Sequence, residues 1–79
     1  IRACRSHAPY INSLPWHKSQ KLLADNGEYA DFEFFLAPTF DFLMKLFSAG
    51  AMIEVISPAS LRKIMKIWVA DMYDMYRND

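Results

Sequence analysis

The sequence predicts an α+β fold, a ferredoxin-like split βαβ sandwich in the order β-α-β-β-α-β with an additional C-terminal helix. Three observations lead to this prediction. An Asn-Gly pair at 26–27 joins two strand-like runs as a hairpin. A segment with helical periodicity follows the hairpin, and a second, longer one closes the chain. Strand–helix crossovers on either side of a hairpin make the split βαβ pattern.

The first half of the chain is expected to contain three strands and a short helix. Residues 6–13 suit one or two helical turns, with Ser6 as a candidate N-cap and Pro9 in the first turn. The run Asp-Asn-Gly-Glu at 25–28 is the clearest turn, because Asn-Gly adopts positive φ at little cost. The expected strands are residues 1–5, 19–24 and 29–37.

The second half is expected to form helix, strand and helix. Thr39 is a good N-cap, and Gly50 suits the left-handed residue that ends a helix. A strand follows at 52–56, and then Ser57 as N-cap and Pro58 as first residue open a helix that runs to Tyr76. The apolar stripe of the first helix is Phe40, Leu43, Met44 and Phe47. The stripe of the second is Leu61, Ile64, Met65, Trp68, Met72 and Tyr76.

Composition limits the classes of function. Hydrophobic residues make up 53% of 79 residues and aromatic residues 15%, so some apolar surface is expected to face a partner or a neighbouring domain. The net charge of zero argues against direct binding of DNA phosphates. One cysteine permits no internal disulfide, which fits a cytoplasmic setting. No apolar run approaches the roughly 18–20 residues that span a membrane.

The sequence predicts a non-enzymatic domain without metal or cofactor. Cys4, His7 and His17 are the only residues that suggest a metal or nucleophile, and their spacing fits no zinc template. There is no coherent acid–base pair and no glycine-rich phosphate loop. We expect residues 1–79 to be a single domain, and a fragment of a larger protein because residue 1 is an Ile that opens within a strand.

Two groups of residues are candidate recognition surfaces. Alternation in the third strand puts Phe35 on the face of Asp31 and Glu33, opposite Phe32 and Phe34. That face is either a solvated, charge-balanced surface or a docking and ligand surface, formed by Arg2, Glu33, Phe35 and Glu54. The loop residues Trp16 and His17 are either an exposed recognition element or, as is commoner for a loop Trp, a cover over the core.

The last helix carries charges that oppose its own dipole. Its basic residues Arg62, Lys63 and Lys66 lie toward the positive end, and Asp71, Asp74 and Asp79 lie at or beyond the negative end. Two copies that cross antiparallel about a two-fold axis near residues 68–70 would pair these charges, with apolar contact from Ile67 and Tyr73. The alternative is a solvated charged face with a mild local cost.

Several short motifs resemble those of a known family. They are Ser48-Ala49-Gly50, Glu54-Val55, Ser57-Pro58, Leu61-Arg62, Tyr76 and the run His17–Gln20. Together they are similar to the C-terminal extension (WCX domain) that follows the WYL domain of bacterial transcriptional regulators. The resemblance implies a ferredoxin-like module for dimerisation and regulation. It implies DNA binding only through a helix-turn-helix domain that this chain lacks, as it lacks the WYL domain.

The function expected from the resemblance is therefore regulatory. The domain would hold two subunits in register, as a homodimer that also contacts the adjacent WYL domain of its own chain. An alternative prediction from fold analogy is a sensing module that binds a small molecule or nucleotide on its sheet face or at a dimer edge.

Overall fold

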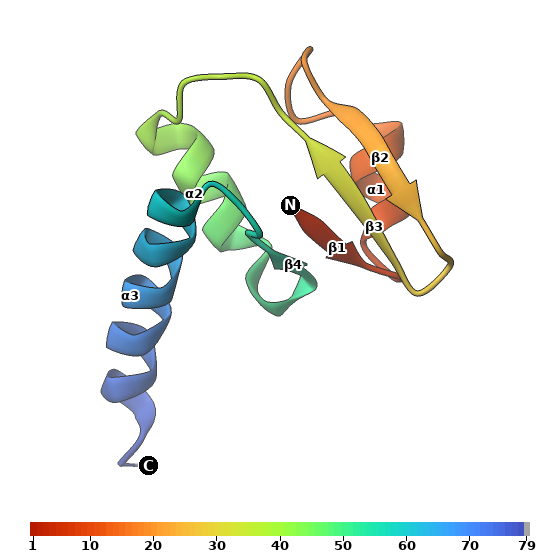
Figure 1. Cartoon of the computed structure of the whole chain (residues 1–79). Coiled ribbons are helices and arrows are strands. Elements are labelled where there is room, and N and C mark those ends of the chain that lie inside the picture. The colour runs from red at the N-terminus through yellow and green to blue at the C-terminus, as the bar shows by residue number, and fades with distance from the viewer. Residues whose placement is uncertain (79) are drawn as a thin grey trace.

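The computed structural model describes residues 1–78 and has the α+β architecture that the sequence predicts (Figure 1). Four strands form one antiparallel sheet, and a long helix ends the chain. The elements in chain order are β1 (Arg2–Cys4), α1 (Ala8–Ser13), β2 (Lys21–Asp25), β3 (Tyr29–Glu33), α2 (Phe40–Ser48), a 3-10 turn (Gly50–Met52), β4 (Ile53–Glu54) and α3 (Ala59–Tyr76).

The order of the strands in the sheet differs from their order in the chain. It is β2-β3-β1-β4, so that β3 and β4 flank β1. Arg2 lies opposite Asp31 of β3 on one side and opposite Glu54 of β4 on the other. A bulge at Leu23 interrupts the pairing of β2 with β3, between Leu22 and Ala24. The connection β1–α1–β2 thus passes over β3, and β3–α2–β4 passes over β1.

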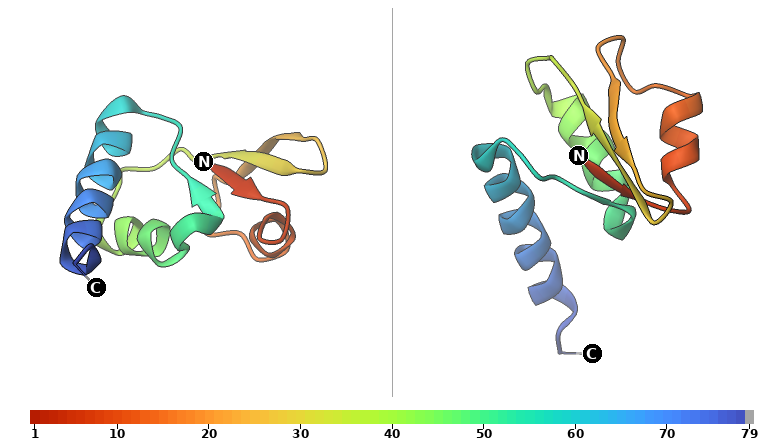
Figure 2. Two further views of the ribbon diagram at one scale, coloured as in Figure 1. Left: turned by 90° about the horizontal axis from the view of Figure 1, so that it is seen from below. Right: turned by 45° about the vertical axis from the view of Figure 1, so that its right-hand side comes forward.

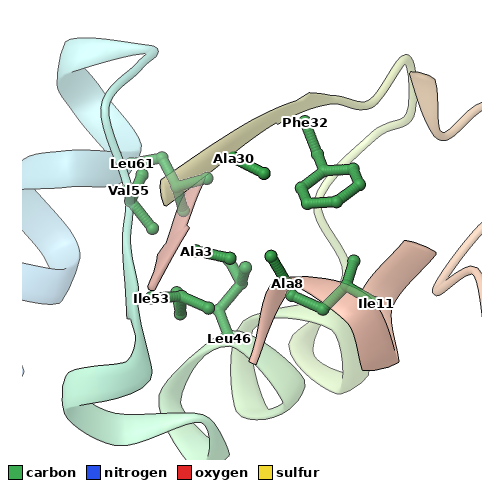
Figure 3. Close-up of a cluster of buried hydrophobic side chains, with 9 residues drawn as sticks. All are labelled: Ala3, Ala8, Ile11, Ala30, Phe32, Leu46, Ile53, Val55 and Leu61. Atoms are coloured by element: carbon green, nitrogen blue, oxygen red, sulfur yellow. The ribbon is translucent and has the colours of Figure 1, made fainter. Parts of the chain in front are cut away.

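Helices α1 and α2 cover one face of the sheet and enclose the core (Figure 2). Ala3 and Ala30 are register partners at the centre of the sheet, and their small side chains let Ile11 and Leu46 approach closely. Phe32 extends the core toward α1 (Figure 3). The buried residues are Ala3, Ala8, Ile11, Ala30, Phe32, Leu46, Ile53, Val55 and Leu61.

The predicted boundaries of α2 are confirmed. Thr39 is the N-cap, and its Oγ1 accepts a hydrogen bond from the backbone N–H of Phe42 at 3.2 Å. Asp41 lies in the first turn, where the helix dipole favours an acidic side chain. Gly50 follows the helix with φ of +56°, the left-handed conformation expected there.

The apolar stripe predicted for α2 was wrong in part. Leu46 is fully buried although it was not assigned to that stripe, and Phe40 and Met44 are exposed. The reason is that α2 has two packed faces. Leu46 points to the sheet, whereas Phe47 makes an edge-on contact with Trp68 of α3 at 5.6 Å between ring centroids. A single periodic stripe does not describe a helix between two partners.

The turn at 25–28 is present as predicted. The Asp25 carboxylate accepts a hydrogen bond from the N–H of Gly27 at 2.9 Å, and the Asn26 side chain accepts from Glu28 and Tyr29. Gly27 has φ of +85°, which a residue with a Cβ adopts at a cost. Side-chain and backbone preferences therefore agree at this turn.

The strands are shorter than predicted, most clearly the third. It was expected to span 29–37 but ends at Glu33, because its partner β2 begins only at Lys21. Residues 19 and 20 belong instead to a turn in which Gln20 N–H donates to the His17 carbonyl at 3.0 Å. Beyond Glu33 the backbone has no strand to pair with on that side.

The predicted serine caps of α1 and α3 were also wrong. His7 occupies the N-cap of α1, and the Ser6 hydroxyl lies 3.3 Å from Cys4 Sγ instead. Pro58 is the N-cap of α3, in an extended conformation, and its carbonyl accepts the first helical bond from the N–H of Arg62 at 3.0 Å. The Ser57–Pro58 peptide bond is cis.

Helix α3 packs against the rest of the molecule through its first half only. Leu61 is buried, and Met65 and Trp68 are half-buried against the core and α2. Met72 and Tyr76, which the sequence assigned to the same stripe, are exposed. The C-terminal half extends beyond the sheet and the other helices (Figure 1, Figure 2), which gives the molecule a longest dimension of 39 Å.

Candidate interaction surfaces

The open face of the sheet is centred on Arg2. Its Nε donates to Asp31 Oδ1 at 2.9 Å and its Nη2 to Asp31 Oδ2 at 3.2 Å. The guanidinium carbon also lies 4.0 Å from the centroid of the Tyr29 ring. Hydrogen bonding to Arg2 lowers the pKa of the Asp31 carboxyl. Arg2 and Asp31 therefore balance each other's charge within the sheet.

Phe35 was predicted to continue the face of Asp31 and Glu33, and the structure places it outside the strand. It lies two residues beyond the end of β3, and its side chain is 90% exposed. Its backbone N–H donates to Ser19 Oγ at 2.9 Å, which anchors the main chain while the ring faces solvent. Of the four residues predicted to form one surface, Arg2 and Glu54 lie opposite each other and Glu33 lies along β3 opposite Lys21.

Arg62 was predicted to pair with a second subunit, and the structure assigns it another contact. Its Nη1 donates to Glu54 Oε2 at 2.6 Å and to the Val55 carbonyl at 2.8 Å. The Arg62 guanidinium thus connects the first turn of α3 to β4 and to Val55, the residue that follows β4. Arg62 therefore has an acidic partner within its own chain.

Trp16 covers the end of the core. Its ring stacks on Phe34 with 6.2 Å between centroids and an interplanar angle of 17°. Phe34 in turn makes an edge-on contact with Phe42 of α2 at 5.4 Å, and Lys45 Nζ lies 5.7 Å from the Trp16 ring centroid. Of the two interpretations of this loop tryptophan, the structure supports packing against the core.

His17 organises the turn that follows Trp16. Its Nδ1 accepts the backbone N–H of Ser19 at 3.0 Å and lies 2.7 Å from Ser19 Oγ. Because Nδ1 accepts a backbone N–H and therefore carries no proton, the Ser19 hydroxyl is the donor in its contact with Nδ1. These contacts assign the ring proton of the neutral imidazole to Nε2. They link His17 to the same loop that presents Phe35.

Gln20 joins this turn to α1, a role that reasoning from the sequence missed. Its Oε1 accepts from the N–H of Trp16 at 3.0 Å, and its Nε2 donates to the carbonyl of Ile11 at 2.8 Å. That carbonyl lies in the last turn of α1, where no intrahelical donor is available. An amide that both donates and accepts satisfies two backbone groups at once.

Helix α3 exposes both charged and apolar side chains along most of its length. Lys63, Lys66 and Asp71 make no ion pair within 4.0 Å among residues 1–78, and Asp74 makes only a 3.7 Å contact with Arg77. The helix has no acidic residue in its first turn and no basic residue in its last. Its exposed apolar side chains are Ile64, Ile67, Val69, Met72, Tyr73, Met75 and Tyr76.

A cavity of about 310 Å³ lies between the end of β3 and the β4–α3 connection. Most of its lining residues are aromatic or aliphatic, and Asp31 and Glu33 are among the lining residues. The sequence did not indicate this cavity, because its walls come from five separate segments. The apolar lining includes Ile1, Phe32, Phe34, Phe42, Ile56 and Leu61.

Metal-ligating residues do not converge in the part of the chain that the structure describes. No group of three or more His, Cys, Asp or Glu side chains is placed to hold an ion there. Cys4 Sγ lies 3.6 Å from Met52 Sδ, and hydrogen bonding to the Ser6 hydroxyl lowers the pKa of the Cys4 thiol. Within residues 1–78, no helix combines the length and apolar character that a membrane span requires.

Comparison of the chain with protein-family models, with curated proteins and with solved structures gives no match. Family and function are therefore argued below from the residues, the fold and the exposed surfaces alone.

Proposed function

We propose that this chain is the regulatory and dimerisation domain of a WYL-type bacterial transcriptional regulator. It has no catalytic activity of its own, acts in the cytoplasm, and reaches DNA only through a separate helix-turn-helix domain. Its partners are a second copy and the WYL domain of the same protein. The observation that carries the proposal is the exposed apolar surface of α3, since a helix that exposes so many apolar side chains is stable when something covers them.

The proposal includes a ferredoxin-like fold of reduced size. Two features support it. The β1–α1–β2 connection passes over β3 and the β3–α2–β4 connection passes over β1, and both helices lie on one face of the sheet. The open face is charge-balanced by Arg2 and Asp31. The family motifs have structural roles in this chain: Gly50 ends α2, Arg62 anchors α3, and His17 and Gln20 build one turn.

The test is the mass of the chain in solution, measured by light scattering after size exclusion over a range of concentrations and at low and high salt. We expect a reversible dimer that weakens as salt rises, because charges on α3 contribute to it. A monomer at every concentration would contradict dimerisation as the function of this chain. Addition of a separately purified WYL domain, followed by the same measurement, tests the second contact.

A second candidate function is supported by the cavity beside Ile1 and Phe34. A volume of about 310 Å³ with an apolar lining falls at the lower end of small-ligand sites. In this alternative the chain is a sensing module for a small apolar or aromatic effector. The site is then the cavity, whereas Phe35, the expected centre of the sheet face, takes no part in it.

Tryptophan fluorescence provides a direct test of the alternative. Trp16 stacks on Phe34, which lines the cavity, so a bound aromatic compound should change its emission. The probe is a panel of small aromatic acids and amines titrated into the chain, with Leu61→Phe as a variant that fills the cavity. Saturable changes that Leu61→Phe abolishes support sensing. Identical responses in both proteins exclude the cavity as the site.

A further inference from the structure

We propose that α3 pairs antiparallel with α3 of a second copy through the face formed by Lys63, Ile67, Ala70 and Asp74, so that Lys63 of each copy meets Asp74 of the other. This inference rests on the proposed function and deepens it, because it names the partner, the face and the contacts. The two helices are antiparallel, as expected from the sequence, but the residues that make the contacts differ from those predicted there.

The four residues share one face of the helix. Their spacing of 4, 3 and 4 positions returns to the same side of an α-helix, and Lys63 and Asp74 stand about 16 Å apart along the axis. Leu61 and Met65, which pack against the core and α2, lie on the opposite side. The face therefore points away from the molecule, and the body of the chain does not obstruct a partner.

The face is complementary to itself. The midpoint between Lys63 and Asp74 is also the midpoint between Ile67 and Ala70, so a two-fold axis there puts each residue opposite its complement. A basic side chain meets an acidic one at both ends, and Ile67 meets the small Ala70 near the centre. Lys66, beside this face, reaches the exposed ring of Tyr73 in the other copy.

Within the described part of the chain, the charges of this face have no comparable partner. Among residues 1–78, Lys63 makes no ion pair, and Asp74 makes only the 3.7 Å contact with Arg77, in which both side chains are more than half exposed. Asp74 also lies in the last turn of α3, where the dipole disfavours an acidic residue. Pairing between two copies places Lys63 and Asp74 each beside an opposite charge, which the isolated helix does not provide.

The decisive experiment is a charge exchange between two variants. In Lys63→Glu both contacts become acidic–acidic, and in Asp74→Lys both become basic–basic. Each variant alone should dissociate about tenfold more readily than the unaltered chain. An equimolar mixture should form a heterodimer, because the introduced glutamate then meets the introduced lysine, and the retained Asp74 meets the retained Lys63. Association is measured by sedimentation equilibrium, and the mixed species by native mass spectrometry.

Two matched controls separate this face from general effects of charge and apolar area. Lys18→Glu changes the net charge by the same amount at an exposed loop and should leave association unchanged. Ile67→Ala should weaken association, whereas Val69→Ala, at an exposed position of the same helix outside the face, should not. Circular dichroism of each variant should match the unaltered chain, since both charge changes suit the helix dipole better.

The outcomes are distinct. Weakened single variants with a restored mixture support the pairing. A dimer that neither charge variant affects would overturn this face while leaving dimerisation intact. A monomeric unaltered chain at all concentrations would overturn the pairing together with the dimerisation on which it rests.

Discussion

Arg62 and Glu54 join the start of α3 to the strand that precedes it, with 2.6 Å between the Arg62 Nη1 and Glu54 Oε2 atoms. The same nitrogen donates to the Val55 carbonyl at 2.8 Å. β4 has only two residues, so this contact supplements a short strand pairing with β1. This junction joins the first turn of α3 to the sheet, beside the packing of Leu61 in the core.

Arg62→Ala should therefore destabilise the chain by about 1 kcal/mol, the scale of a charged hydrogen bond combined with an exposed ion pair. The free energy of unfolding is measured by urea denaturation at low protein concentration. Arg77→Ala is the control, because it removes the same side chain from the end of the same helix, where its one ion pair among residues 1–78 is the 3.7 Å contact with Asp74. Equal losses for the two variants would contradict a structural role of Arg62.

The pair Arg2–Asp31 should make stability depend on acid pH. Because Arg2 holds the folded-state pKa of Asp31 below its ordinary value of 3.8, the pair stabilises the fold above that value. This stabilisation is lost as pH falls through the lowered pKa. Thermal unfolding between pH 5 and about pH 2 should show the loss.

Asp31→Asn should lack this part of the pH dependence, since the amide does not titrate. Arg2→Met should lack it as well, because it removes the group that lowers the pKa of Asp31. If the acid-dependent part persisted in both variants, its source would be another carboxyl group.

Phe34 and Phe35 are adjacent and should respond in opposite ways to truncation. Phe34 packs between Trp16 and Phe42, so Phe34→Ala should cost about 2 kcal/mol of unfolding free energy. Phe35 is 90% exposed, so Phe35→Ala should change stability by less than about 0.5 kcal/mol. Denaturation of both variants measures the difference, and equal costs would mean that Phe35 packs in solution.

Gly50 should resist substitution for reasons of backbone conformation alone. An added Cβ would meet no atom within 4 Å, but the φ of +56° is unfavourable for residues with a side chain. Gly50→Ala should cost about 1 kcal/mol, and Gly50→Asn should cost less because Asn tolerates this conformation. A loss in Gly50→Ala near zero, measured by denaturation, would contradict the left-handed assignment.

Local features of the fold were predictable from the sequence, and the candidate surfaces were predictable only in part. The turn at 25–28, the Thr39 cap and the Gly50 stop depend on chemistry within a few residues, and all three are present. The charges of α3 were identified from the sequence, but the contact of Arg62 with Glu54 was not. Glu54 is eight residues away in the chain, and only packing of α3 against β4 brings the two together.

By itself, the sequence determined the α+β class, the order of elements and the charge pattern along α3, because periodicity, caps and turns are local. Tertiary structure decided where β3 ends, since a strand continues only as far as its neighbour, and β2 begins at Lys21. It also decided that Leu46 is buried, because the face of α2 that carries it packs against the sheet. Pairing and burial depend on which segments meet, and segments distant in the chain meet only in the folded molecule.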